Sequence, residues 1–92
     1  MEIKFEQTNT RGSFYIELDG KRAASMEFSK AGNDRIIISH TDVSDVLRGK
    51  NAGKQLVAAA VDYARKNNIK IVPLCPFARS VFNKVKEYED VL

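Results

Sequence analysis

The chain has 92 residues, of which 43% are hydrophobic, and it carries a net charge of +3 at pH 7. This length suits one domain spanning residues 1–92, and no stretch approaches the roughly 20 apolar residues of a membrane-spanning helix. A single cysteine excludes an internal disulfide, and the N-terminus carries no apolar signal segment, so we expect a cytoplasmic protein with no membrane partner.

The positive charge fits an anionic partner, and a coenzyme that carries phosphates meets this requirement as well as nucleic acid does. No aromatic-rich strand is typical of an RNA-binding motif, and no set of cysteines and histidines has the spacing of a zinc finger. The sequence therefore disfavours nucleic acid as a partner and predicts no metal site.

Apolar residues that alternate with polar ones predict four strands in the first half of the chain. We expect these strands at residues 2–8, 14–18, 23–28 and 35–43. Asp19-Gly20 is a strong signal for a two-residue hairpin between the second and third strands. The run from Ile36 to Ile38 is typical of a central strand that is covered on both faces.

The second half of the chain predicts a helix, a strand and a second helix. The first helix is expected at residues 52–66, with a buried stripe formed by Leu56, Val57, Ala60, Val61 and Ala64. Asn67 or Asn68 ends it in the left-handed conformation. A short strand follows at 69–74, and the last helix begins at Cys75-Pro76, because proline suits the first helical position. The apolar face of this helix is expected at Phe77, Val81, Phe82 and Val85. The order ββββαβα predicts an α+β fold, a sheet with helices packed on it.

The most informative segment is residues 41–54, where a strand leads through a loop of small residues into a helix. Backbone N–H groups remain unpaired at a helix N-terminus, and the partial positive charge there favours a phosphate or pyrophosphate. Gly49 and Gly53 allow a ligand and the neighbouring chain to approach closely, and Arg48, Lys50 and Lys54 add positive charge. The spacing matches neither a Walker loop nor a dinucleotide fingerprint.

The run Arg48-Gly49-Lys50-Asn51-Ala52-Gly53 resembles the acetyl-CoA signature of the GNAT N-acetyltransferase superfamily. Asn51 stands where the superfamily prefers glycine, and asparagine tolerates a positive φ better than most residues. His40-Thr41-Asp42-Val43, Pro73-Leu74-Cys75 and Glu87-Tyr88 are similar to a short GNAT-like subfamily of about this length. The resemblance covers nearly the whole chain.

This resemblance implies a GNAT-like mixed sheet, a reduced version of the acyl-CoA N-acyltransferase fold, with acetyl-CoA as co-substrate. It implies an N-acetyltransferase that transfers the acetyl group to an amine of unknown identity. The chain lacks the N-terminal helices with which larger relatives build an acceptor site, which favours an open surface and a macromolecular acceptor. A non-catalytic module that binds acetyl-CoA or CoA is the alternative, because no general base or acid is marked by spacing.

The resemblance also assigns residues to the coenzyme. The set consists of Thr41, Val43, Arg48, Gly49, Lys50, Asn51, Ala52, Gly53, Lys54, Cys75 and Arg79. In GNAT folds the backbone at the positions of Thr41 and Val43 pairs with the pantetheine arm like an added strand. Arg79, one turn into the last helix, is expected either to reach a phosphate or to face solvent.

Cys75 and His40 are the candidate catalytic residues. Cys75 is expected beside the thioester, where the start of a helix favours the thiolate, and the alternative is a small buried hydrophobic residue. His40 lies on the strand face opposite Thr41 and could deprotonate an amine, because histidines titrate near neutral pH. A hydrogen-bonded structural histidine is the alternative. Further candidates for base or acid are Glu17, Glu27, Asp42 and Tyr88.

Overall fold

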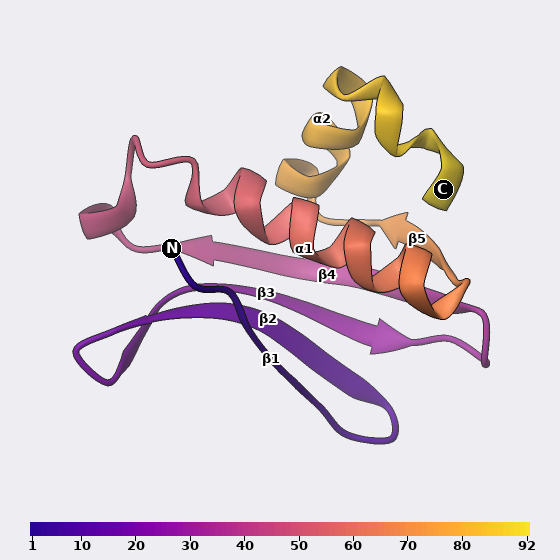
Figure 1. The fold of residues 1–92 in the computed structure, drawn as a ribbon, viewed down its shortest axis with the longest axis horizontal. Coiled ribbons are helices and arrows are strands. Elements are labelled where there is room, and N and C mark those ends of the chain that lie inside the picture. The colour runs from indigo at the N-terminus through magenta and orange to yellow at the C-terminus, as the bar shows by residue number, and fades with distance from the viewer.

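The computed structural model describes residues 1–92, and its five strands form one sheet in the order β1-β2-β3-β4-β5 (Figure 1). The strands are β1 (Lys4–Gln7), β2 (Arg11–Leu18), β3 (Lys21–Lys30), β4 (Arg35–Val43) and β5 (Lys70–Pro73). Neighbouring strands from β1 to β4 are antiparallel, and β5 runs parallel to β4. The mixed sheet that the sequence predicts is therefore confirmed.

Two α-helices and two 3-10 turns complete the chain. They are η1 (Asp45–Leu47), α1 (Ala52–Asn67), α2 (Pro76–Lys84) and η2 (Lys86–Val91). The predicted element order ββββαβα is confirmed, with strand and helix ends differing by a few residues from those expected. None of the helices is long and apolar enough to cross a lipid bilayer.

The hairpin between β2 and β3 turns at Asp19 and Gly20, as predicted. Both residues have positive φ values, 53° and 76°, which match a turn whose twist suits antiparallel strands. Leu18 therefore pairs with Lys21 across a two-residue loop.

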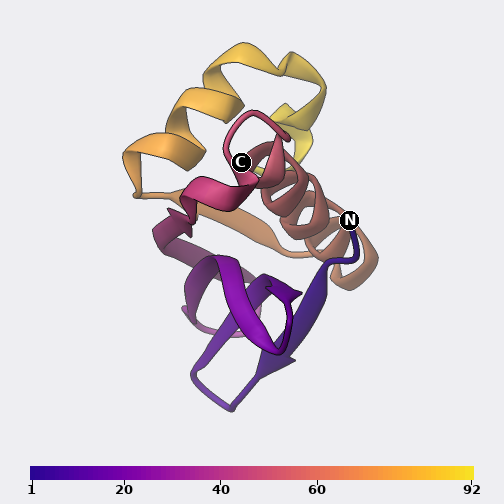
Figure 2. The ribbon, with the colours of Figure 1, turned by 90° about the vertical axis from the view of Figure 1, so that its left-hand side faces the viewer.

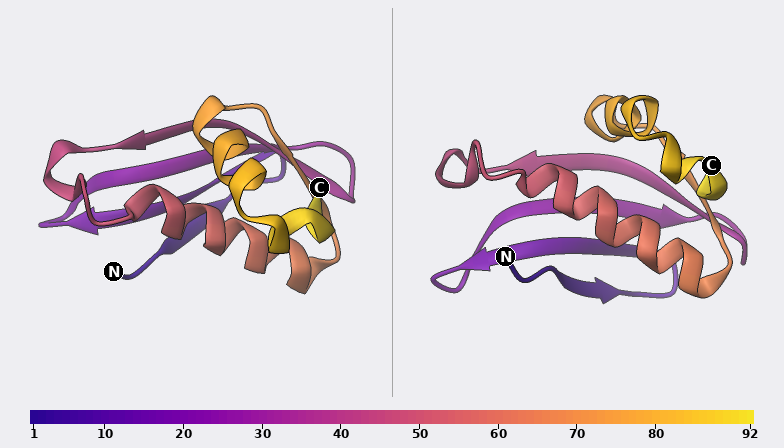
Figure 3. Two further views of the ribbon diagram at one scale, coloured as in Figure 1. Left: turned by 90° about the horizontal axis from the view of Figure 1, so that it is seen from above. Right: turned by 45° about the horizontal axis from the view of Figure 1, so that its top comes forward.

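Helix α1 lies across the sheet, and α2 packs beside it near β4 and β5 (Figure 3). The predicted stripe of α1 is fully buried, at Leu56, Val57, Ala60, Val61 and Ala64. Apolar side chains of β2, β3, β4 and β5 meet this stripe in one continuous core. Seen from its side, the molecule has the helices above a strongly twisted sheet whose N-terminal strands lie below (Figure 2).

One expectation about β4 is wrong. The three isoleucines suggest a strand covered on both faces, yet only Ile36 and Ile38 are buried, whereas Ile37 is half-buried. Successive side chains of a strand point to opposite faces, so Ile37 belongs to the sheet face that lacks the helices.

Candidate active site

Strand β4 consists of two halves that differ in their partners. From Arg35 to Ile38 it pairs with both β3 and β5. The chain of β5 ends at Pro73, and the N–H groups of Leu74 and Cys75 then both donate to the Ile38 carbonyl, at 3.0 and 3.1 Å. Beyond Ile38, β4 keeps β3 as its only strand neighbour.

A β-bulge marks the boundary between these halves. Phe28 pairs with Ile38 but Glu27 pairs with His40, so Ser39 is an extra residue in β4. The bulge reverses the alternation of side chains. Thr41 consequently lies on the same face as Ile38, whereas His40 is exposed on the opposite face.

The unpaired half of β4 presents backbone groups at its open edge. The Ser44 N–H donates to the Ala23 carbonyl at 2.7 Å. Every second residue of β4, counted back from Ser44, therefore directs its backbone groups to β3. Hydrogen-bonding direction alternates along an antiparallel strand. Thr41 and Val43 therefore direct their N–H and C=O groups away from β3, towards the edge that β5 has left.

The loop after η1 leads into α1 through a left-handed residue. Asn51 has φ 60° and ψ 26°, as its tolerance of positive φ predicts. Its carbonyl accepts the Gln55 N–H at 3.0 Å, but no side chain caps the helix. The N–H groups of Ala52, Gly53 and Lys54 have no hydrogen-bond partner, so they form the uncapped positive end of the α1 dipole.

A cavity of about 400 Å³ lies between this helix start and the open half of β4. It is lined by Thr41, Val43, Leu47, Arg48, Gly49, Asn51, Ala52, Gly53, Lys54 and Phe77. All the residues that the sequence assigns to the coenzyme line this cavity except Lys50, Cys75 and Arg79. Lys50 and Arg79 are exposed, and the Lys50 carbonyl accepts a hydrogen bond from the Gln55 side chain at 3.3 Å.

Phe77 and Leu47 are cavity residues that sequence reasoning missed. Phe77 was assigned to the buried face of α2, but it is 39% exposed, and Ala78 takes the core position instead. The spacing of Ala78 to Val81 and Phe82 is i, i+3 and i+4, which also fits a buried helical stripe. The stripe through Phe77 has the larger apolar side chain, so the sequence alone favours that stripe over the one through Ala78.

Gly53 allows the neighbouring chain to approach closely, as expected, and the residue that approaches is Phe77. A Cβ atom at this position would lie 2.5 Å from Cζ of Phe77, so the missing side chain makes room for the Phe77 ring. The ring in turn forms one wall of the cavity. Gly49, by contrast, has φ 81° and open space around it, so its backbone conformation is what requires glycine.

The charged side chains at the cavity are cationic and exposed. Arg48 makes an ion pair with Asp45 at 2.8 Å, in which both side chains are more than three-quarters exposed. Pairs of this kind contribute little to stability and exchange readily for another anion. Lys54 lines the same cavity. The positive charge therefore lies on the same side as the unpaired amides of α1.

Cys75 lies next to the cavity but does not line it. It is 6% exposed, and its Sγ accepts the Ala78 N–H at 3.3 Å, which makes it the N-cap of α2. The same sulfur is 3.1 Å from Oγ1 of Thr41, in a hydrogen bond across the gap between β4 and the start of α2. Thr41 thus connects the cavity with the buried thiol.

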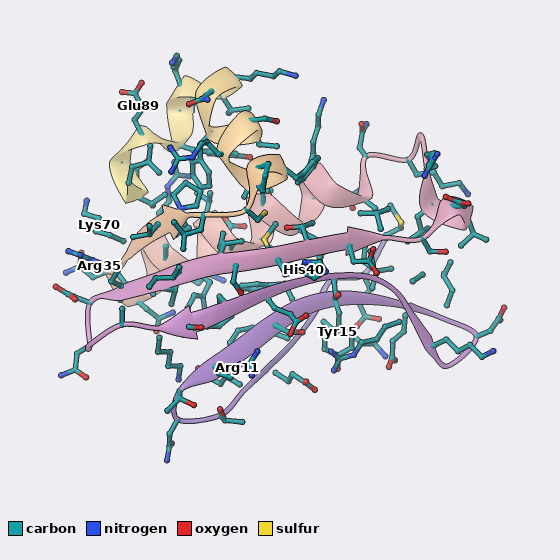
Figure 4. The ribbon with its side chains drawn as sticks, turned by 180° about the vertical axis from the view of Figure 1, so that it is seen from behind. Arg11, Tyr15, Arg35, His40, Lys70 and Glu89 are labelled. Atoms are coloured by element: carbon teal, nitrogen blue, oxygen red, sulfur yellow. The ribbon has the colours of Figure 1, made fainter.

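The remaining candidates for base and acid are dispersed. His40 lies on the open face of the sheet, where Tyr15 also lies, and Figure 4 shows both on the side away from the helices. Glu17 makes an ion pair with Lys4 at 2.6 Å. Tyr88 packs against Phe82 near the C-terminal part of α1, distant from the helix start that forms the cavity.

Comparison with solved structures shows the same fold elsewhere. A GCN5-like protein from Staphylococcus aureus, solved by NMR, is 40% identical, has a TM-score of 0.75, and is matched over 98% of this chain and 85% of its own. A ribosomal-protein-alanine N-acetyltransferase from Brucella melitensis is only 18% identical but has a TM-score of 0.68. The match covers 85% of this chain and 62% of the Brucella enzyme.

Sequence comparisons lead to the same group of proteins. Protein NATD1 of Xenopus tropicalis is 28% identical over 74 residues, which are 79% of this chain and 68% of NATD1. The family model described as GCN5-related N-acetyl-transferase matches residues 13–91, a range that contains the β4 bulge, the loop and both helices. The chain therefore belongs to the family of GCN5-related N-acetyltransferases.

Proposed function

We propose that this protein binds acetyl-CoA and transfers the acetyl group to an amine. The observation that carries the proposal is the continuity between the open edge of β4 and the cavity at the start of α1. Thr41 and Val43 belong to both, since their backbone groups border the edge and the residues line the cavity. Such a site offers strand-like hydrogen bonds to one part of a ligand and an anion site to another.

The start of α1 would bind the pyrophosphate of the coenzyme. The unpaired N–H groups of Ala52, Gly53 and Lys54 converge there, and a helix N-terminus favours negative charge. Arg48 would exchange its exposed partner Asp45 for a phosphate oxygen. The solved structures of related fold include a streptothricin acetyltransferase from Bacillus anthracis in complex with acetyl coenzyme A.

The open edge of β4 would hold the pantetheine arm, which carries amide groups that can pair like a strand. In this arrangement Val43 and Thr41 bind the arm in that order from the helix start towards Cys75. A backbone N–H of this edge would polarise the thioester carbonyl as an oxyanion develops. Holding the thioester and the amine together would supply much of the rate enhancement.

Direct attack by the amine is the mechanism that we propose, rather than transient acetylation of Cys75. The Cys75 sulfur is engaged by Ala78 and Thr41, and neither of them is a base that could activate a thiol. Cys75 would then support the wall of the thioester site. A Cys75→Ala variant should accordingly keep acetyl transfer.

A non-catalytic acetyl-CoA module is the second candidate, because none of the candidate bases lines the cavity. Incubation with radiolabelled acetyl-CoA and a panel of small amines and basic peptides distinguishes the two. Transfer of label supports the enzyme, saturable binding without transfer supports the module, and no binding contradicts both. A parallel titration with a DNA or RNA oligomer at two salt concentrations tests nucleic acid as a partner.

We also infer a cytoplasmic location, which the unpaired thiol of Cys75 supports.

A further inference from the structure

We propose that His40 accepts the proton of the acceptor amine, and that Glu27 is the positioning residue that orients the His40 imidazole. This inference rests on the proposed function and adds to it the face of the sheet from which the amine arrives. It would make His40 a catalytic residue, since its ring contacts the amine, and it explains why that side chain lies outside the coenzyme cavity.

The acceptor amine must be able to reach the thioester. On the helix side, the space beside Thr41 is the proposed coenzyme cavity, which the start of α1, Leu47 and Phe77 line and which the coenzyme would fill. On the other side, no helix covers the sheet (Figure 4). His40 and Asp42 are exposed there. An amine can therefore reach the open edge of β4 from the face that carries His40.

The bulge at Ser39 determines the sheet face on which His40 lies. Without this extra residue, the alternation from Ile36 and Ile38 would direct His40 into the core and Thr41 to the solvent. The bulge therefore places Thr41 beside the coenzyme cavity and His40 on the open face at the same time. Bulges commonly re-aim side chains next to active sites.

Glu27 lies opposite His40 on the neighbouring strand β3. It is the direct cross-strand partner of His40, and side chains of such pairs are close enough to interact. Its carboxylate is 3.8 Å from Arg11, whereas the other ion pairs of this face, Lys4 with Glu17 and Arg22 with Glu6, measure 2.6 and 2.7 Å. The Glu27 carboxylate is thus less tightly bound than its neighbours.

The charged and titratable groups around His40 come from β2, β3 and β4. They are Arg11 and Tyr15 on β2, Glu27 on β3 and Asp42 on β4, while β5 ends before it reaches His40. Asp42 makes no ion pair. Two carboxylates at strand positions next to one imidazole favour a cationic amine as the incoming molecule.

Acetyl transfer begins with a proton transfer to His40. The imidazole removes one proton from the ammonium group and becomes an imidazolium, which leaves a neutral amine. The amine nitrogen attacks the thioester carbon, a C–N bond forms and the C–S bond breaks. The proton on the new amide nitrogen passes to the CoA sulfur, which leaves as a thiol, and the imidazolium returns its proton to solvent.

The positioning role is tested by NMR of the imidazole, because His40 is the only histidine and its signals need no assignment. At about pH 8.5, a carboxylate partner should hold the imidazole of His40 in one tautomer. The nitrogen shifts should therefore show one tautomer in the native protein and a mixture in Glu27→Ala. Glu6→Ala removes a carboxylate of the same face and should leave the native tautomer. Mixed tautomers in the native protein would overturn the role of Glu27.

The amine site is tested with propylamine, and with 1-propanol as the uncharged control of similar size. Added to the protein saturated with CoA, propylamine should shift the His40 ring signals and the Asp42 amide, and 1-propanol should not. His40→Gln should slow acetylation of propylamine about 100-fold or more, with acetyl-CoA affinity unchanged. Propylamine shifts confined to the helix side, or equal acetylation rates in the native protein and His40→Gln, would exclude His40 as the proton acceptor.

Failure of this inference is distinguishable from failure of the proposed function. If acetyl-CoA perturbs the amides of Thr41 and the loop but propylamine leaves His40 unmoved, only the acceptor assignment is lost. If acetyl-CoA perturbs neither the amide of Thr41 nor those of the loop, the coenzyme site itself is wrong.

Discussion

The two ends of α1 use the same residue in the same conformation for opposite purposes. Asn51 before the helix has φ 60°, and Asn68 after it has φ 55°. At the C-terminal end, the Asn68 N–H donates to the carbonyls of Ala64 and Arg65, and Ile69 also donates to Ala64. At the N-terminal end, the amides of the first turn have no partner.

This contrast separates structure from function within one helix. The C-terminal end is closed by its cap and by the tail, since Arg65 donates to Asp90 and to the Glu87 carbonyl. The N-terminal end keeps its donors free beside a cationic loop and a cavity. Unpaired amides at a helix start are a cost to the fold that a bound phosphate can offset.

The largest expected effect comes from valine at Asn51. A β-branched residue at positive φ is strained by about 1–3 kcal/mol, so Asn51→Val should lose stability in urea unfolding. It should also weaken acetyl-CoA binding about tenfold or more by calorimetry, because the loop could no longer direct its amides at the ligand.

Asn68→Val is the matched control, with the same strain at the closed end. It should lose a similar amount of stability and keep its acetyl-CoA affinity. Asn51→Gly should bind as well as the native protein, since glycine adopts this conformation without strain. Equal loss of affinity in Asn51→Val and Asn68→Val would mean that the two ends do not differ in function.

A second, smaller effect is expected at the start of α2, which differs from α1 in having a side-chain cap. Cys75→Ala removes the acceptor of the Ala78 N–H and should cost about 1 kcal/mol of stability in urea unfolding. Cys75→Ser should retain the cap and lose less. If the two variants unfold at the same urea concentration, the sulfur does not act as a cap.

The smallest effect is expected at the closed end of α1. A hydrogen bond from Arg65 lowers the pKa of the Asp90 carboxyl below its ordinary value of 3.8. The interaction therefore stabilises the fold above this value and is lost as the pH falls through the lowered pKa. Asp90→Asn should flatten the decline in stability below about pH 4, measured by urea unfolding across pH. Acetyl-CoA affinity at neutral pH should not change, and a change there would link the tail to the site.

Periodicity and turn chemistry predicted the element order and the buried stripe of α1, because each depends on local spacing. The positive φ of Asn51 followed from the intrinsic tolerance of asparagine. The bulge at Ser39 and the half-buried state of Ile37 depend on how β4 meets β3 and β5, which no local pattern encodes. Phe77 was misplaced for a similar reason, since the choice between Phe77 and Ala78 as the core residue depends on the neighbouring Gly53.

The most direct test of the coenzyme site is a map of backbone amide shifts on addition of acetyl-CoA. The largest shifts should fall on Thr41, Val43 and the segment from Arg48 to Lys54, which form the open edge and the uncapped helix start. The amides of Asn68 and Ile69, at the closed end of the same helix, should remain in place. Large shifts at that closed end or in the N-terminal hairpins, with the amides from Arg48 to Lys54 unmoved, would contradict the account.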